Sequence, residues 1–161
     1  MQKDIIIRRG AREDLPQVFD LIMELAEYEK APHEVENSIE QMTEDGFGEQ
    51  PVFGFIVALL NKQIIGLSLY YYRYSTWKGK LLYLEDLIVT EKYRNNGIGK
   101  RLLDETVKEA LKLNCTGLQW QVLDWNKSAI EFYRKLGASF DGEWVNCRLS
   151  REQLLNYNFS S

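Results

Sequence analysis

The chain has 161 residues, of which 45% are hydrophobic and 27% charged, as expected for one globular domain with a full core. Its formal net charge of −4 argues against nucleic acid as a partner, because phosphate binding usually needs a basic surface. The longest apolar run, Phe53 to Leu60, is too short to span a bilayer, and the N-terminal residues show no secretory signal. The two cysteines, Cys115 and Cys147, lack metal-binding spacing, so we expect reduced thiols in a cytoplasmic protein without a metal site.

Residue periodicity, turns and caps predict a strand, two helices and a three-stranded meander in the first half of the chain. In chain order, these elements cover residues 5–7, 13–29, 38–44, 52–60, 63–73 and 81–90. Ser38, with Gln41 three residues later, is the expected N-cap of the second helix. The two-residue turn Asn61-Lys62 is expected to join the first two strands of the meander as a hairpin.

After Gly97 the apolar residues recur at helical spacing instead of strand spacing. The predicted elements of this half are a helix over 98–111, a strand over 117–123, a short helix from Asn126 to Gly137, and a last hairpin within 139–149. Residues after Arg151 are expected to form a short helical or frayed tail. The order of elements predicts an α/β fold with a mixed, mainly antiparallel sheet, in a single domain over residues 1–161.

A polar turn with two glycines joins the last strand of the meander to the long helix. Backbone N–H groups at the start of a helix have no partner within it, and the helix dipole adds partial positive charge there. The turn is therefore a candidate phosphate-binding site. Gly97 and Gly99 leave room for close backbone approach, and Arg94 and Lys100 can add positive charge.

Three phosphate-binding motifs compete here, besides a glycine turn that only reverses the chain. A P-loop needs Ser or Thr after Gly-Lys, but Arg101 follows Lys100. A Rossmann fingerprint needs a third Gly or Ala at the position of Leu102. The remaining pattern, Arg-x-x-Gly-x-Gly from Arg94 to Gly99, resembles the acetyl-CoA pyrophosphate loop of the GCN5-related N-acetyltransferase (GNAT) family.

A second segment, Asp124 to Ala138, resembles the other cofactor motif of that family. Asn126 begins the predicted helix and Tyr133 follows seven residues later, so the two share one helix face. Without the resemblance, Tyr133 is equally explained as a half-buried packing residue. The resemblance implies acetyl-CoA as co-substrate and assigns contacts with it to the strand end, the glycine turn and this helix. The implied cofactor-binding residues are Leu87, Ile88, Val89, Arg94, Asn95, Asn96, Gly97, Ile98, Gly99, Lys100, Asn126, Lys127, Ser128, Ala129 and Tyr133.

The resemblance covers nearly the whole chain and extends to the diamine acetyltransferase branch, which includes spermidine/spermine N1-acetyltransferases and thialysine Nε-acetyltransferases. Segments 24–30, 44–48, 70–72 and 82–86 carry it, and segments 74–79 and 122–126 look more like the thialysine type. The polyamine type has an aspartate where this chain has Ser75, so a second buried ammonium would lack a charge partner. The branch implies a small cationic substrate with a primary amine, and a homodimer. Thialysine, lysine, diamines and polyamines remain open.

The acidic pair Glu85-Asp86 interrupts an apolar strand, which is costly unless the pair faces a cavity or a partner charge. Neighbouring side chains in a strand point to opposite faces, but a local bulge could bring both carboxylates to one site. The alternative is a solvated strand end. By resemblance, Glu85 holds the substrate amine and helps remove its proton, while Asp86, Glu29 and Tyr28 help to hold the cation.

By resemblance, Tyr133 is the general acid towards the leaving thiolate. A thiol titrates near ~8.5 and a phenol near ~10, so this transfer is uphill by only about 1–2 pH units. The implied substrate-binding residues are Tyr28, Glu29, Ser75, Thr76, Trp77, Glu85 and Asp86. The aromatic residues Tyr70, Tyr72, Tyr74 and Trp77 are expected to be exposed, at an interface or amine pocket, or else to pack on the sheet. A non-catalytic coenzyme A-binding module and a protein acetyltransferase remain as rival functions.

Overall fold

The computed structural model describes residues 4–160. These residues form two compact units, and the boundary between the units in the sequence falls between Gln121 and Val122. The first unit contains β1 (Ile6–Arg9), α1 (Leu15–Tyr28), α2 (Ile39–Phe47), β2 (Gly54–Leu60), β3 (Gln63–Ser75), β4 (Gly79–Val89), α3 (Ile98–Lys112) and β5 (Leu118–Gln119). The second unit contains α4 (Lys127–Lys135) and α5 (Arg151–Leu155). None of the helices in residues 4–160 is both long and apolar enough to cross a membrane.

The strands of the first unit form one sheet in the order β1-β2-β3-β4-β5. The first four strands are antiparallel and β5 runs parallel to β4, which confirms the predicted mixed, mainly antiparallel sheet. Asn61 and Lys62 join β2 to β3 with φ angles of 49° and 69°. A two-residue hairpin turn of this hand needs positive φ at both central residues, so the predicted turn forms although it contains no glycine.

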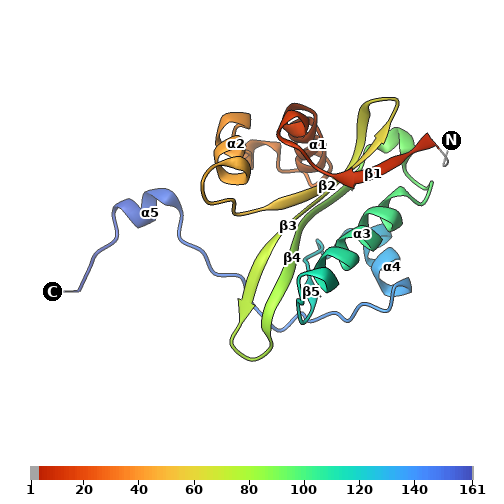
Figure 1. The fold of residues 1–161 in the computed structure, drawn as a ribbon. Coiled ribbons are helices and arrows are strands. Elements are labelled where there is room, and N and C mark those ends of the chain that lie inside the picture. The colour runs from red at the N-terminus through yellow and green to blue at the C-terminus, as the bar shows by residue number, and fades with distance from the viewer. Residues whose placement is uncertain (1–3, 161) are drawn as a thin grey trace. The chain divides into compact units, whose positions relative to one another are not determined.

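The sheet separates two hydrophobic cores, with α1 and α2 on one face and α3 on the other (Figure 1). Successive strand residues point to opposite faces, so Leu69 belongs to the core under α1 while Tyr70 belongs to the core under α3. On the α3 face, the buried hydroxyls of Ser68 and Thr106 lie 2.6 Å apart and tie the helix to the middle of β3. Because of this alternation, consecutive residues of a regular strand cannot contribute side chains to the same site.

Helix caps follow the predicted residues, with one shift. The Ser38 hydroxyl accepts a hydrogen bond from the Gln41 N–H at the start of α2, as predicted. The helix, predicted over residues 38–44, continues through Gly46 to Phe47, and Gly48 is its C-cap. A single glycine costs a helix only about 1 kcal/mol. A Cβ at Gly46 would lie 2.6 Å from the Phe53 ring, so the close packing of this ring leaves no room for a larger residue.

Two predicted elements differ in the second half of the chain. The strand predicted over 117–123 is reduced to the two residues of β5, and the hairpin predicted within 139–149 is wrong, because these residues have no regular structure. A strand needs a neighbour for its backbone groups, and the described residues of the second unit contain no strand. The apolar side chains of the segment, such as Trp144 and Val145, are accordingly exposed.

Candidate active site

The acidic pair of β4 lies at a β-bulge. Leu69 of β3 lies opposite Asp86, and the next residue, Tyr70, lies opposite Leu84. Glu85 is therefore an extra residue with no partner on β3. A bulge of this kind re-aims consecutive side chains that a regular strand would send to opposite faces. The structure thus contains the local distortion through which an adjacent Glu-Asp pair can serve one site.

A third carboxylate, that of Glu29 at the end of α1, joins the pair. Burial, with the negative charges of Glu85 and Glu29, raises the pKa of Asp86 to about 7. Burial, with the charge of Glu85, also raises the pKa of Glu29. Both shifts have the sign expected of clustered acids held partly out of water. The three predicted acidic residues are therefore close enough to repel one another, and a cation between them would relieve that repulsion.

Two tyrosines that the sequence analysis did not assign to the site, Tyr71 and Tyr83, lie next to Glu85. The Tyr71 hydroxyl donates a hydrogen bond to Glu85 Oε2 at 3.1 Å, and the Tyr71 and Tyr83 rings pack with centroids 5.3 Å apart. Burial and the Glu85 charge raise the pKa of Tyr71 to about 12 and also raise the pKa of Tyr83. Both phenols remain protonated at neutral pH. The run Tyr70-Tyr71-Tyr72 was visible in the sequence, but only the β3–β4 register shows that Tyr71 faces the carboxylates.

One glutamate holds the start of the turn between β4 and α3. The Glu24 carboxylate of α1 accepts hydrogen bonds from the Thr90 hydroxyl at 2.7 Å and from the Glu91 N–H at 3.0 Å. These contacts join residues 66 and 67 positions apart. The sequence showed Glu24 only as a polar residue of a helix, so its role in positioning the turn was missed.

Arg94 links the same turn to the carboxylate end of α1. Its Nε donates to the Val89 carbonyl at 2.9 Å, its Nη2 lies 3.7 Å from Glu24, and its guanidinium sits 5.0 Å from the centre of the Tyr28 ring. A guanidinium over an aromatic face is attractive, so Arg94 also holds the predicted substrate residue Tyr28. Arg94 therefore has a positioning role that the sequence analysis did not assign to it.

The turn ends in a helix start that presents backbone donors. Asn95 and Gly97 have φ angles of 61° and 74°, and the Asn96 amide donates to the carbonyls of Tyr93 and Arg94. Gly97 is the N-cap of α3 and provides no side-chain acceptor for the first-turn N–H groups. Those groups lack partners inside the helix and are therefore suited to bind an anion.

The remaining residues of the predicted phosphate loop contribute space and charge. A methyl group added to Gly99 would lie 3.8 Å from Val89 Cγ2, which is an ordinary contact distance. The fold itself therefore does not demand glycine at this position, whereas close approach of a ligand would. Lys100 pairs with Asp104 one turn along the helix, and the Ile98 side chain is buried in the core.

An open strand edge connects the carboxylates with the helix start. β5 pairs with β4 only at Leu82 and Tyr83, so within residues 4–121 the β5 side of β4 has no partner strand from Leu84 to Val89. The segment includes the predicted cofactor residues Leu87, Ile88 and Val89. The Val89 carbonyl is already occupied by Arg94 Nε. The other N–H and C=O groups of such an edge can pair with an extended ligand in the manner of another strand.

Three predicted substrate residues lie away from this cluster. Ser75, Thr76 and Trp77 form the tip of the β3–β4 hairpin, where the Ser75 hydroxyl accepts hydrogen bonds from the N–H groups of Trp77 and Lys78. Ser75 is four residues from Tyr71 along β3, a distance of roughly 13 Å in an extended strand. Within the first unit these residues are therefore not brought to the carboxylates.

The second cofactor motif lies in the second unit. The Asn126 side chain accepts a hydrogen bond from the Ala129 N–H at 3.3 Å and caps α4, as predicted. Tyr133 is the buried residue of this helix, whereas Lys127 and Ser128 are exposed. The two alternatives for the aromatic residues divide between them: Tyr70 is 4% exposed and packs on the sheet in the α3 core, while Tyr72, Tyr74 and Trp77 are exposed.

The raised pKa of Asp86 predicts a pH-dependent effect of one substitution. In an unfolded chain an aspartate titrates near ~3.9, so keeping Asp86 ionised in the fold costs free energy. This cost is absent below pH ~4 and grows as the pH rises to about 7. Asp86→Asn should therefore raise the unfolding midpoint by at least ~2 °C at pH 8 and leave it unchanged at pH 4.

Thermal unfolding followed by circular dichroism at the two pH values provides the measurement. Asp20→Asn, at an exposed position of α1, is the matched control and should show no pH-dependent gain. An equal change at pH 4 and pH 8 for Asp86→Asn contradicts the placement of this carboxylate.

The acetyltransferase (GNAT) family model matches residues 15–138 of the chain. Thialysine N-epsilon-acetyltransferase of Bos taurus is 41% identical over 142 residues, which cover 83% of this chain and 84% of the bovine protein. The Mus musculus protein of the same name is 38% identical over 159 residues, covering 92% and 94%. Spermidine/spermine N(1)-acetyltransferase-like protein 1 of Homo sapiens is 34% identical over 93% of this chain, but that match covers 23% of the human protein.

Solved structures agree at the level of the fold. An aminoglycoside acetyltransferase from an uncultured soil metagenomic sample superposes with a TM-score of 0.76 at 23% identity, covering 92% of this chain and 97% of the other. These comparisons confirm the family resemblance and the α/β fold predicted from the sequence. The chain belongs to the acetyltransferase (GNAT) family and is an acetyltransferase.

Proposed function

We propose that the chain transfers an acetyl group from acetyl-CoA to the primary amine of a small cationic substrate, either a thialysine- or lysine-like amino acid or a diamine. The observation that carries this proposal is the group of three carboxylates at the β4 bulge, in which burial and the neighbouring acids raise the pKa of Asp86 to about 7. An ammonium group is the ligand that would relieve the repulsion within this group.

The relatives support the choice of substrate class. Thialysine N-epsilon-acetyltransferases of cattle and mouse cover most of this chain at 41% and 38% identity. An L-ornithine N5-acetyltransferase of Arabidopsis thaliana is 38% identical over 62% of this chain. Both substrate names denote amino acids, which agrees with a site built to bind a small cation.

The residues of the first unit fit acetyl-CoA as the acetyl donor. Acetyl-CoA supplies an acetyl group as a thioester, together with a diphosphate and an extended pantetheine arm. We propose that the backbone donors from Asn95 to Lys100 bind the diphosphate and that the free edge of Leu87–Val89 binds the arm. The edge and the helix start are continuous along the chain, which supports a single extended ligand.

The carboxylates have two tasks. An alkyl ammonium titrates near ~10.4, so the substrate arrives charged and must lose a proton before its nitrogen can attack. We propose that Glu85 orients the amine and receives or relays this proton, and that Asp86 and Glu29, with Tyr28, hold the cationic substrate. The Tyr71 hydrogen bond fixes one oxygen of Glu85, which leaves the other available to the amine.

Tyr133 is proposed as the general acid for the leaving thiolate, and Asn126 to Ala129 as further cofactor contacts. The Asn126 cap and the position of Tyr133 on the same helix support this assignment. The family match extends from residue 15 to residue 138 and so crosses the junction between the two units. This supports our proposal that residues 1–161 form a single acetyltransferase domain.

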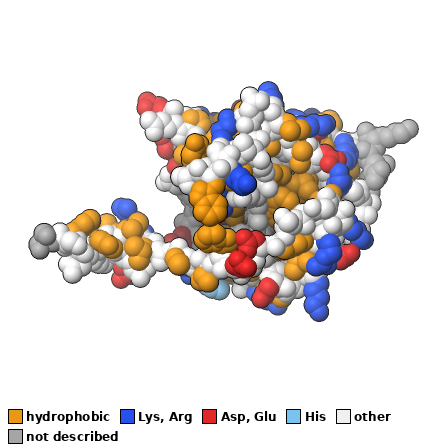
Figure 2. Space-filling view, turned by 90° about the horizontal axis from the view of Figure 1, so that it is seen from below, with side chains coloured by type: hydrophobic (Ala, Val, Ile, Leu, Met, Phe, Trp, Pro, Cys, Tyr) orange, Lys and Arg blue, Asp and Glu red, His pale blue; other side chains and the backbone are white. Residues whose placement is uncertain are grey.

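We also propose a cytoplasmic homodimer. Both cysteines are free thiols, in agreement with a reducing compartment. Hydrophobic side chains gather along the C-terminal segment with α5 (Figure 2), where Trp144, Val145, Leu155 and Phe159 are all more than two-thirds exposed. Exposed apolar residues in such number are typical of a surface that a partner covers.

Acetylation of polyamines is the second candidate function. The match to the human spermidine/spermine N(1)-acetyltransferase-like protein supports it, whereas Ser75 provides no carboxylate at the hairpin tip for a second ammonium. Ser75 instead closes the turn through its hydroxyl. A non-catalytic coenzyme A-binding module would have no need for the carboxylate group at the bulge.

An amine panel tests the proposal. The chain is incubated with acetyl-CoA and thialysine, lysine, putrescine, spermidine or spermine, and free coenzyme A thiol is measured. We expect faster turnover of thialysine, lysine and the diamine than of either polyamine. In the same assay, Glu85→Gln should raise KM for the amine by about tenfold and shift the pH profile, because it removes a charge-assisted hydrogen bond.

Glu91→Gln, an exposed substitution in the turn after β4, is the matched control and should keep the wild-type KM. Absence of thiol release with every amine contradicts the proposal and leaves the coenzyme A-binding module and the protein acetyltransferase as the remaining functions. A Glu85→Gln enzyme equal to wild type at every pH contradicts the role given to Glu85.

Substitution of Tyr133 tests the proposed acid. Tyr133→Phe keeps the ring but removes the proton, so kcat should fall by ~100-fold or more while KM for acetyl-CoA stays within about twofold. Steady-state kinetics with the best amine provide the measurement. Tyr157→Phe, an exposed tyrosine of the same unit, is the control. Unchanged turnover in Tyr133→Phe rules out the acid role.

A further inference from the structure

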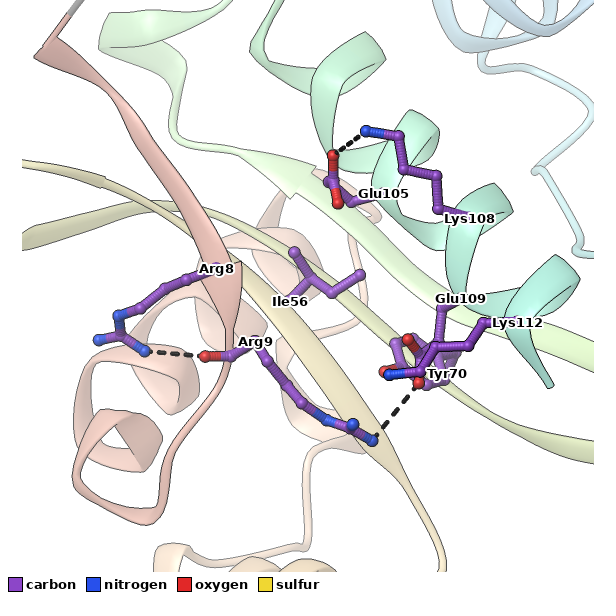
Figure 3. Close-up of a pocket in the computed structure, with 8 residues that line it drawn as sticks. All are labelled: Arg8, Arg9, Ile56, Tyr70, Glu105, Lys108, Glu109 and Lys112. Carbon is purple, nitrogen blue, oxygen red and sulfur yellow. Dashed lines mark hydrogen bonds and ion pairs between the residues drawn. The ribbon is translucent and has the colours of Figure 1, made fainter.

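The α3 face of the sheet, opposite the face that carries Leu69 and α1, contains a cavity that is separate from the carboxylate group. The cavity, of about 260 Å³, opens between α3 and the first three strands, and Arg9, Tyr70, Glu109 and Lys112 are among its lining residues (Figure 3). It shares none of its lining residues with the carboxylate group at the bulge. None of the roles proposed above uses it.

Two buried polar atoms of this cavity have no hydrogen-bond partner among the described residues. They are the hydroxyl oxygen of Tyr70, a residue that is 4% exposed, and Oε1 of Glu109. Burial and the nearby Glu109 charge raise the pKa of Tyr70 to about 12, so its hydroxyl is protonated at neutral pH. A buried polar atom without a partner costs about 1–3 kcal/mol, and more when the group is charged. Both atoms are therefore available to hydrogen-bond with a ligand that enters the cavity.

The charges around the cavity restrict what that ligand can be. Arg8 is engaged by Asp14 through two hydrogen bonds of 2.7 and 2.9 Å. Lys108 is engaged by Glu105 at 2.6 Å. Among the other charged lining residues, Arg9 and Lys112 face the single carboxylate of Glu109, and the contact from Arg9 Nη2 to Glu109 Oε1 is a loose 3.5 Å.

We propose that this cavity binds a small zwitterionic α-amino acid. The ammonium donates to Glu109 Oε1 and to the Tyr70 hydroxyl oxygen, and the carboxylate pairs with Lys112 and Arg9. A simple anion would leave Glu109 Oε1 without a donor and add a second negative charge beside it. A simple cation would add a third positive charge next to Arg9 and Lys112. Of these three classes, a ligand with both charges a few ångströms apart best matches the charges of Glu109, Arg9 and Lys112.

The size of the cavity limits the amino acid. Its volume of about 260 Å³ falls just below the ~300–1,000 Å³ of pockets that hold drug-sized ligands. A small side chain is therefore expected, and glycine is a suitable probe because it carries both charges and little else.

Isothermal titration calorimetry without acetyl-CoA tests the proposal with glycine, acetate and methylammonium at one salt concentration. We expect glycine to bind at least about tenfold more tightly than either single-charge analogue, because each analogue leaves one set of partners unsatisfied. Glu109→Gln and Tyr70→Phe should each weaken glycine binding by about tenfold. Tyr70→Phe keeps the aromatic ring in the core, so this variant still tests the site if the Glu109→Gln protein does not fold.

Two controls separate this site from the proposed catalytic site. Glu105→Gln alters a carboxylate one turn away that is already paired with Lys108, and should keep the glycine affinity within about twofold. Glu85→Gln should keep it as well. Loss of glycine binding in Glu85→Gln but not in Glu109→Gln overturns the proposal, since the amino acid would then bind at the bulge.

Binding of acetate or methylammonium as tight as that of glycine also overturns the proposal. The absence of any heat with glycine at ~20 mM, about twentyfold above a millimolar Kd, overturns it as well. Each of these results leaves acetyl transfer at the bulge untouched, because no variant on the α3 face enters that reaction.

Discussion

Repulsion among three carboxylates is the constraint on which the account of this enzyme depends. Glu85 and Asp86 are consecutive in a strand, yet Glu29 of α1 affects the pKa of Asp86 and is itself affected by Glu85. Proteins rarely keep such a group partly buried unless a cation binds there or one acid stays protonated. The bulge in β4, where Glu85 has no partner on β3, is the backbone feature that makes this arrangement possible.

The rest of the first unit holds this group next to a place for an extended, anionic ligand. Glu24 and Arg94 fasten the turn after β4 to α1, the helix that ends in Tyr28 and Glu29. The same turn leads into the N-terminus of α3, where backbone N–H groups favour an anion. The proposed cation site and the proposed anion site are thus joined by one strand edge, and an enzyme that brings an amine to a coenzyme thioester needs this combination.

Much of the local structure of the first unit and of α4 could be predicted from local sequence signals. The helix caps at Ser38 and Asn126, the hairpin at Asn61-Lys62 and the glycine turn before α3 depend on neighbouring residues, and each formed where expected. Contacts between distant residues could not be predicted: Glu24 meets Thr90 across 66 positions, and the choice of Tyr71 over Tyr70 depends on strand register. The strand predicted over 117–123 and the hairpin within 139–149 went wrong because periodicity does not tell whether a neighbouring strand exists.

Proton release on amine binding tests the central claim most directly. Calorimetry at pH 7 with a diamine such as putrescine, without acetyl-CoA, is run in two buffers that differ in ionisation enthalpy. An ammonium among the carboxylates should lower the pKa of Asp86 from about 7, so about half a proton should be released per amine bound, and Asp86→Asn should abolish the release. Amine binding with no buffer dependence, or with the same release in Asp86→Asn, contradicts the account.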